Sequence, residues 1–505
     1  MSKRTSFLLI MVIFLVTVAA LAVASPGAAR PAASPQVIYQ AGAAKAVVTP
    51  PLEGNPVLWM AGYSVGRPAE SVHDELFTRV IILDDGQTPM AFVMVDVLGL
   101  TSDDIGRIES AIVAVVPELA GHILVSATHT HEAPDTIGLW GGAGQPPFAH
   151  PRPLAWIEYI GAQSAAAAGQ AWADRAPVTF TLAALDHAPL DWLVNDSRDP
   201  QVRYNKVHLM VLQGANGTVA TLVNWAMHPE SMGSENTAIT ADFVKYLLDE
   251  VETQMGGMAL MVNGAIGGLL SDKGGTFPEF PDPSFERTEA IGRTAAQIML
   301  DHLNNPTQSD LVQSFSQLPP ITYTTRRYAV PVENPLFLTA WRFHRVPKHM
   351  YRQTDVPAQE RWRPADQPLA RYTDFTTNFI TFGPVSMLTY GGELYPELLV
   401  GGIERLGDPE FRDAIFEPPL IENPVWSPYT FKFLLGLTDD FTGYIPPVAE
   451  WDGWDGAYGE EFATSWDLAP IASYNMHLLM LGYQTGQYPA TLPDFLQPIY
   501  DTYKP

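Results

Sequence analysis

The sequence predicts a mixed α/β (α+β) fold, with central β-sheets, flanking helices and long ordered loops in one large domain. Beyond about residue 37, short β-rich apolar runs alternate with longer segments of helical periodicity, which is typical of such folds. Hydrophobic residues make up 47% of the 505 residues, enough to bury a sizeable core. The 44 prolines, many of them in the second half, favour long ordered loops over compact turns.

The expected strands and helices follow from the spacing of apolar residues and from the composition of each segment. Ala241–Glu252 places Phe243, Leu247 and Val251 on one helical face, at intervals of four. The expected strands are Ala91–Val95, Ile123–Ala127, Val219–Trp225, Met258–Val262 and Val385–Tyr390. The expected helices are Asp103–Val115, Trp156–Trp172, Ala241–Glu252 and Glu286–Leu303.

The net charge and the cysteine content restrict the classes of partner and of catalytic site that the chain can have. A formal net charge of -26 argues against a nucleic-acid partner, because neutralising phosphates requires clustered Lys and Arg. The chain has no cysteine, so disulfides, thiolate metal ligands and cysteine nucleophiles are excluded. A metal would have to bind His, Asp, Glu, Tyr or backbone oxygen.

The first residues are typical of a targeting segment. Lys3 and Arg4 precede the apolar run Phe7–Leu21, and Ala22–Ala24 offers small residues for cleavage. We therefore expect a signal peptide at 1–25, a flexible Ala/Pro-rich lead-in at 26–37 and a folded part at 38–505. The protein would be secreted, periplasmic or held at the cell surface. An uncleaved membrane anchor is the alternative, since about 18 apolar residues can span a bilayer.

One region differs in charge from the rest. Residues 321–371 contain nine Arg or Lys against four acids, interleaved with Trp341, Tyr351 and Trp362. One interpretation is a surface excursion that packs on the acidic body. The other is a cap or membrane-facing patch that meets an anionic or amphipathic substrate.

A histidine pair follows the expected strand at 123–127. The segment Ser126–His131 reads SATHTH, and alternation along an extended chain places His129 and His131 on one side. Two imidazoles at a strand end can form half of a metal site, since imidazole is the commonest zinc ligand. A chance pair of surface histidines is the alternative.

Two more strand ends carry polar side chains. His228 follows the strand at 219–225 in the sequence AMHPES, and Glu393 follows the strand at 385–390 after Gly391 and Gly392. Ligands collect at the carboxyl ends of strands in open sheets, which favours a shared site. Each residue taken alone is compatible with a structural role.

A glycine-rich loop follows the strand at 258–262. It reads NGAIGGLLSDKGG, with Gly267 and Gly268 before Ser271. Backbone N–H groups of such a loop can bind an anion or an oxyanion. The loop matches no Walker or dinucleotide motif, so we do not expect a nucleotide site.

The order of these motifs resembles the neutral/alkaline non-lysosomal ceramidase family. The entry segment AGAAKAVVTPP (Ala41–Pro51) is followed by WMAGY, VHDELFTRVIIL, SATHTH, NWAMHP, NGAIGG, GGELYPE and TGYIPP. The likeness spans roughly residues 38–470, and THTH is its most specific part.

The resemblance implies one catalytic zinc ion and assigns roles residue by residue. It makes His129, His228, Glu393 and Tyr444 the zinc ligands and places His131 beside the reacting bond as general acid–base. Tyr458, Arg198 and the Gly267–Gly268 amides would stabilise the oxyanion.

Several positions depart from the family pattern. Gly391 replaces the proline before the glutamate, and Asp196 stands where arginine is usual, with Arg198 two places on. The family's Gly-Asp-Val-Ser-Pro-Asn reads here as Gly268-Leu269-Leu270-Ser271-Asp272-Lys273. This difference favours zinc-activated water over Ser271 as the nucleophile. The resemblance also implies a catalytic domain without the C-terminal β-sandwich of fuller members.

The expected activity is hydrolysis of an N-acyl amide bond. The resemblance implies ceramide, cleaved to a sphingoid base and a fatty acid, with the apolar tail bound by aromatic loops such as 140–148. Other N-acyl amides or esters are alternatives, as is a non-catalytic lipid- or glycan-binding protein with the same fold. The expected partner is an amphipathic N-acyl lipid or a small N-acyl amide, with peripheral membrane contact and without nucleic acid.

Overall fold

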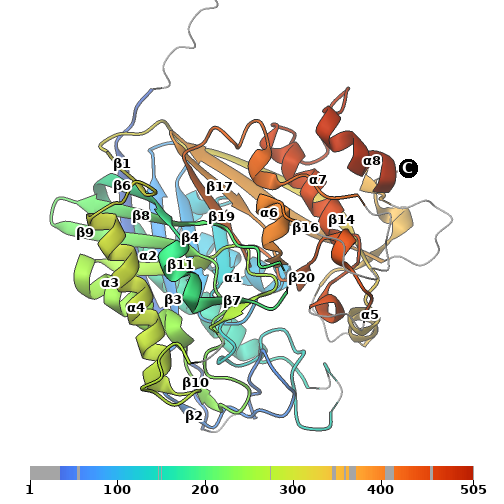
Figure 1. Cartoon of the computed structure of the whole chain (residues 1–505), viewed down its shortest axis with the longest axis horizontal. Helices are drawn as coiled ribbons and strands as arrows, with labels where there is room; N and C mark the ends of the chain where they lie inside the picture. The colour runs from blue at the N-terminus through green and yellow to red at the C-terminus, as the bar shows by residue number, and fades with distance from the viewer. Residues whose placement is uncertain are drawn as a thin grey trace, which may run out of the picture. The chain divides into compact units, whose positions relative to one another are not determined.

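The computed structural model describes residues 35–503 except 54–56, 146, 149, 199, 273–274, 344–347, 358–359, 363–370, 404–414 and 455–458. The expected signal peptide and most of the lead-in therefore lie outside the described residues. Residues 36–505 form one compact unit (Figure 1). Within its described part, no helix has the length and apolar character needed to span a membrane.

Among the described residues, one large sheet has the strand order β11-β9-β8-β6-β1-β3-β4-β5, with β13 paired to β6. These strands are β1 (Tyr39–Val47), β3 (Phe77–Asp84), β4 (Met90–Val95), β5 (Ile123–Ala127), β6 (Ala176–Asp186), β8 (Lys206–Gly214), β9 (Gly217–Trp225), β11 (Met258–Asn263) and β13 (Leu311–Phe315). Two outer pairs are parallel, β4 with β5 and β9 with β11, whereas the strands between them pair antiparallel.

A second sheet packs against the first. Its order is β14-β16-β17-β19, with β15 paired to β16. The strands are β14 (Thr322–Val332), β15 (Tyr351–Arg352), β16 (Arg371–Phe382), β17 (Val385–Thr389) and β19 (Phe431–Leu435). Three two-stranded pairs complete the described strands: β2 (Ser71–Val72) with β10 (Ala238–Ile239), β7 (Val194–Asp196) with β12 (Leu269–Ser271), and β18 (Glu393–Leu394) with β20 (Tyr444–Ile445).

Helices cover the outer faces of the two sheets (Figure 1). The described helices are α1 (Ser102–Val115), α2 (Leu154–Ala173), α3 (Asp242–Met255), α4 (Phe285–Asn304), α5 (Pro335–Arg342), α6 (Pro396–Val400), α7 (Leu468–Met480) and α8 (Gln497–Tyr503). α1 and α2 pack on the β1–β3–β4–β5 part of the large sheet, and α7 packs on β14 and β16. α3 and α4 pack on each other and contact β11 and β6.

Successive side chains of a strand point to opposite faces, so the large sheet contributes to two hydrophobic cores. In β3, Val80 and Ile82 join the core beneath α1 and α2, whereas Ile81 and Leu83 join the core shared with the second sheet. Phe382 and Phe433 enter that shared core from the second sheet. The result is a helix–sheet–sheet–helix arrangement.

The sequence predictions for the fold are confirmed. The five expected strands correspond to β4, β5, β9, β11 and β17, and the four expected helices correspond to α1 to α4, with ends that differ by a few residues. α4 begins after Ser284, whose side chain accepts a hydrogen bond from the Arg287 N–H, and α5 begins after Asn334, which caps Leu336 in the same way. These caps explain why the helices begin there.

The basic segment 321–371 contributes to the core as well as to the surface. Its two ends are β14 and the start of β16. Arg326 is fully buried and donates to the Asn475 side chain and to the carbonyls of Tyr483 and Gln484. Lys348 is buried against Asp440. These two cations are therefore not part of a substrate-facing basic patch.

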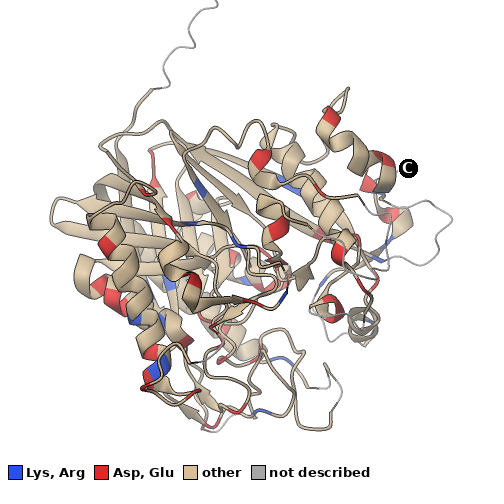
Figure 2. Ribbon diagram, in the orientation of Figure 1, with Lys and Arg blue, Asp and Glu red and all other residues tan. Residues whose placement is uncertain are grey.

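Most of the charged positions along the helices are acidic (Figure 2). On α3 and α4, two of the cations form ion pairs with acids on these helices. Arg293 lies 2.7 Å from both Glu250 and Glu289, which joins the two helices, and Lys245 pairs with Asp249. Exposed pairs of this kind contribute only tenths of a kcal/mol each.

Candidate metal centre

The carboxyl ends of three parallel strand pairs meet at one place. His129 follows β5, His228 follows β9, and Glu393 follows β17 at the start of β18. β5 and β9 lie near opposite ends of the strand order, yet β11 also contacts β3 and β4. The Asn263 side chain at the end of β11 donates to the Thr128 carbonyl at 2.8 Å. The large sheet therefore curls until its two ends are joined.

His129 is held in an unusual backbone conformation. Its φ is 71°, in the left-handed region that non-glycine residues seldom adopt and that costs of order 1 kcal/mol or more. Its N–H donates to the Val97 carbonyl at 3.0 Å. Its Nδ1 lies 2.7 Å from the Leu98 carbonyl, and because a carbonyl can only accept, Nδ1 carries the proton. The lone pair of Nε2 is then available for a ligand.

The side chain of His228, from the other end of the sheet, lies next to the Nε2 of His129. Its Nε2 lies 3.0 Å from the His129 Nε2, and its side chain is fully buried. Burial, together with His129, lowers the pKa of His228 to about 4, so the imidazole is neutral. Neutral imidazole is the form that binds a metal ion.

Glu393 completes a triangle with the two histidines. Its Oε1 lies 3.4 Å from the His129 Nε2, and its Oε2 lies 3.4 Å from the His228 Nε2. Burial acts to raise the pKa of Glu393, but His129, His228 and the Tyr444 hydroxyl outweigh it and leave this pKa lowered. Tyr444 is the direct partner of Glu393 in the parallel β18–β20 pair. The four expected ligands thus come together.

The spacing of these atoms fits a tetrahedral zinc site. Ligand atoms about 2.0–2.1 Å from one ion, at tetrahedral angles, are roughly 3.3 Å apart. The two imidazole nitrogens lie 3.0 Å apart, and each lies 3.4 Å from one of the two Glu393 carboxylate oxygens. Two imidazoles and a carboxylate are also the donor types that zinc prefers. His129, His131 and His228 also have ligand nitrogens within 4.8 Å of one another, so His131 is close enough to be a ligand.

His131 lies beside this triangle. Its ring centroid is 5.0 Å from that of His129 and 5.2 Å from that of His228. Burial, then the two histidines and Arg67, hold its pKa well below the usual value, so it is neutral. Gly62, at φ 101°, packs so closely that a Cβ there would lie 2.3 Å from the His131 Cγ. The ring is therefore fixed in place by its neighbours.

Glu230 is a site residue that the sequence analysis missed. Its Oε2 lies 3.7 Å from the His131 Nδ1, and its Oε1 accepts from the Ser271 N–H at 3.4 Å. Burial raises the pKa of Glu230 to about 8, so its carboxyl group is largely protonated at neutral pH. The only signal in the sequence is its place two residues after His228.

Ser271 lies at the end of β12, half-buried, next to Glu230. β12 pairs with β7 in register, Leu269 opposite Asp196 and Ser271 opposite Val194. The following residue, Asp272, is ion-paired with Arg287. A carboxyl group therefore does approach Ser271, but it comes from the segment after β9 and not from the serine's own loop.

One of the two expected oxyanion amides already makes another hydrogen bond. The Gly267 N–H donates to the Leu394 carbonyl at 3.0 Å. The Gly268 carbonyl accepts from the N–H of Ser197, and a Cβ at Gly268, whose φ is 79°, would meet the Arg198 guanidinium at 2.4 Å. These contacts bind the loop to the segment that carries Arg198.

Arg198 is surrounded by carboxylates. Its Nε lies 3.3 Å from Asp196, and its two terminal nitrogens lie 2.8 Å from Glu397 and 3.0 Å from Glu450. Contact with an oxyanion would require one of these ion pairs to open. Tyr458 lies outside the described residues, so its expected role stays a prediction.

Comparison with known proteins identifies the fold. No protein-family model and no curated protein sequence matches the chain. Among solved structures, it is similar to neutral ceramidase from Pseudomonas aeruginosa, with a TM-score of 0.62, 14% identity and coverage of 91% of this chain and 77% of that one. The chain has the neutral ceramidase fold.

A second solved structure supports this assignment. A ceramidase complexed with C2 has a TM-score of 0.61 at 14% identity, over 91% of this chain and 78% of that one. The resemblance expected from the sequence motifs is therefore confirmed for the fold. In this ceramidase-like fold, the cluster of His129, His228 and Glu393 lies where the strand ends of both sheets converge.

Proposed function

We propose that this chain is an exported zinc-dependent amidohydrolase that cleaves the N-acyl amide bond of an amphiphilic substrate, as a ceramidase does. The products would be a fatty acid and an amine, which for ceramide is a sphingoid base. Export rests on the leader at 1–25, and contact with a membrane surface would be peripheral.

The observation that carries the proposal is the triangle of His129, His228 and Glu393, in which the two imidazole nitrogens lie 3.0 Å apart and each lies 3.4 Å from one of the Glu393 carboxylate oxygens. A zinc ion held by these residues and Tyr444 would supply Lewis acidity, polarising the amide carbonyl and lowering the pKa of water. The ceramidase-like fold supports the same class of reaction.

His131 would move the proton. Its neutral ring accepts a proton from the attacking water and passes it to the departing nitrogen. The water oxygen joins the acyl carbon, the C–N bond breaks, and the acid and the amine leave. Gly62 packs against the His131 ring and Glu230 lies 3.7 Å from its Nδ1, and these contacts limit the rotation of the ring.

Ser271 and Arg198 would position the substrate. Ser271 and His131 both lie next to the Glu230 carboxyl group. Arg198 links Asp196, Glu397 and Glu450 and so holds the β12 loop near Glu393. The Gly268 amide and Tyr458 are the remaining candidates for contact with the oxyanion.

A substrate panel tests the proposal. The purified protein is assayed, with zinc and after chelation, on ceramide, other N-acyl amides and the matching esters. Amide hydrolysis that chelation removes and zinc restores is the expected result. Ester cleavage with amides untouched would indicate an esterase. Bound metal without turnover on any substrate would indicate a binding protein.

A further inference from the structure

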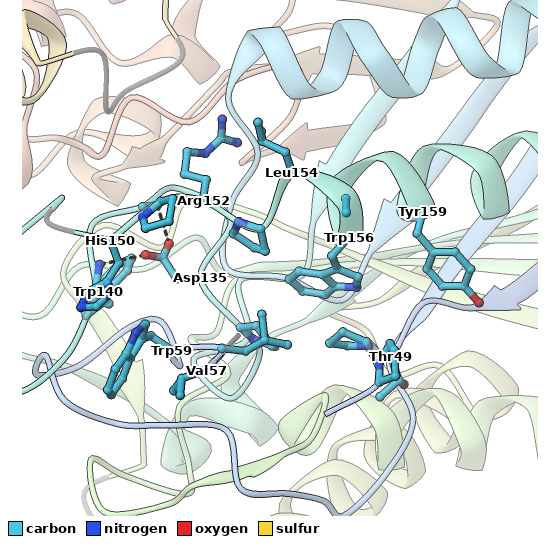
Figure 3. A pocket seen from close by; sticks show the side chains of 18 residues that line it. Thr49, Val57, Trp59, Asp135, Trp140, His150, Arg152, Leu154, Trp156 and Tyr159 are labelled. Carbon is cyan, nitrogen blue, oxygen red and sulfur yellow. Dashed lines mark hydrogen bonds between the residues drawn. The ribbon is translucent and has the colours of Figure 1, made fainter. Parts of the chain in front are cut away.

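A large apolar cavity lies next to the metal centre but does not include its ligands. Its volume is about 910 Å³, which is at the upper end of the range for small-molecule sites. Four segments line it: residues 49–51, 57–59, 134–140 and 150–159, the last of which includes the start of α2. Figure 3 shows the side chains of Val57, Trp59, Trp140, Trp156 and Tyr159 along this cavity.

Most polar groups at the cavity wall are already paired within the protein. His150 is the exception, because its Nε2 is buried and has no hydrogen-bond partner among the described residues. The Asp135 carboxylate accepts from the N–H groups of Ile137, Gly138 and Trp140 at 2.7 to 2.9 Å. The indole N–H of Trp140 donates to the Tyr63 carbonyl, and that of Trp156 donates to the Val48 carbonyl. These groups cannot recognise a polar ligand without breaking internal hydrogen bonds, which makes a hydrocarbon the best-matched occupant.

The mouth of the cavity is apolar as well. Val57 is 60% exposed, Leu154 48% and Tyr159 41%. Leu154 is the first residue of α2, and Tyr159 lies on the same helix. Contiguous exposed apolar side chains around a cavity mark a binding surface more often than isolated ones do.

One pair of chain segments separates the cavity from the reaction centre. Trp59 lines the cavity, and Gly62, three residues later, packs on His131. On the facing segment, Asp135 lines the cavity four residues after His131 and donates its N–H to the Trp59 carbonyl at 2.8 Å. The same two segments therefore build part of the cavity wall and the surroundings of His131.

We propose that this cavity binds one hydrocarbon chain of the amphiphilic substrate. The assignment of that chain to the substrate rests on the function proposed above, whereas binding of a hydrocarbon does not. The apolar wall supplies the binding energy, and the segments 59–62 and 131–135 align the bound chain with the reacting amide.

Binding of linear alkanoates, from hexanoate to hexadecanoate, to the full chain tests the inference without any turnover. Each methylene buried in the cavity should strengthen binding about fourfold until the cavity is full. Val57→Asp should weaken hexadecanoate binding at least tenfold and flatten the dependence on chain length. Ile38→Asp is the matched control, since Ile38 is 58% exposed and does not line the cavity.

Leu154→Asp provides a second variant that should fold, because an acidic residue is favourable in the first turn of a helix. It should also weaken binding. Unchanged affinity in both variants, or equal loss in Ile38→Asp, would overturn the inference. If alkanoates bind as described but no amide is cleaved, the proposed function fails and the hydrocarbon site stands.

Discussion

The Nε2 atoms of His129 and His228 lie 3.0 Å apart, although the strands that carry them, β5 and β9, are near opposite ends of the large sheet. The Nε2 of His129 presents a lone pair, because its Nδ1 donates to the Leu98 carbonyl. With the Glu393 carboxylate 3.4 Å from both nitrogens, a cation is the natural occupant of the space between them.

His131→Ala should keep the metal and lose turnover. The ring lies beside the triangle, and removing a general acid–base group lowers the rate by about 10²–10⁴. Zinc content and turnover of the purified variant are the measurements, with His73→Ala as the control because His73 stacks on Phe285 outside the centre. If zinc content falls as it does in His129→Ala, His131 is a ligand and its assigned role is wrong.

Ser271→Ala should keep measurable activity. Its turnover should fall by about 10²–10³, the loss expected when one oxyanion donor is removed. The next residue, Asp272, is ion-paired with Arg287, and Glu230 accepts a hydrogen bond from the backbone N–H of Ser271 rather than from its hydroxyl. A dead variant that still binds metal, together with a burst of amine release in the parent protein, would instead indicate an acylated Ser271. Mass spectrometry of protein trapped with a slow substrate checks this directly.

Glu417→Gln should change how stability depends on pH. Burial raises the pKa of Glu417 to about 7, from its usual value of 4.5, so the folded state favours the protonated form. The contribution of Glu417 to stability is therefore complete below about pH 4.5 and is lost as pH rises toward 7. Between pH 5 and pH 8 the parent protein should lose about 2 kcal/mol relative to the variant.

Urea unfolding of both proteins at the two pH values measures this difference. Because other groups titrate equally in both, only the difference between the two proteins reports on Glu417. Parallel pH profiles would mean that Glu417 is ionised in the folded state.

Local sequence patterns were sufficient for much of the fold and for part of the site. Apolar runs in the sequence predicted β5, β9 and β17. The polar residues just after these strands, His129, His228 and Glu393, come together in the structure. The curling of the sheet that brings β5 to β9 depends on contacts between distant residues, such as Asn263 with Thr128, and has no local signature.

The surroundings of Ser271 and Arg198 were harder to predict, because they too depend on contacts between distant residues. Glu230 contacts Ser271 only because β12 pairs with β7 and turns back toward the end of β9. The resemblance assigned Arg198 to the oxyanion, but three acids from separate segments surround it: Asp196, Glu397 and Glu450. Such pairings are set by the tertiary structure.

The most direct test of the account is the metal content of the parent protein, His129→Ala, His228→Ala and the control His73→Ala after loading with zinc and removal of the excess. About one zinc per chain should remain in the parent and in His73→Ala, and both site variants should lose it while keeping their circular dichroism spectra. Zinc retained equally in His129→Ala and His228→Ala would contradict the account.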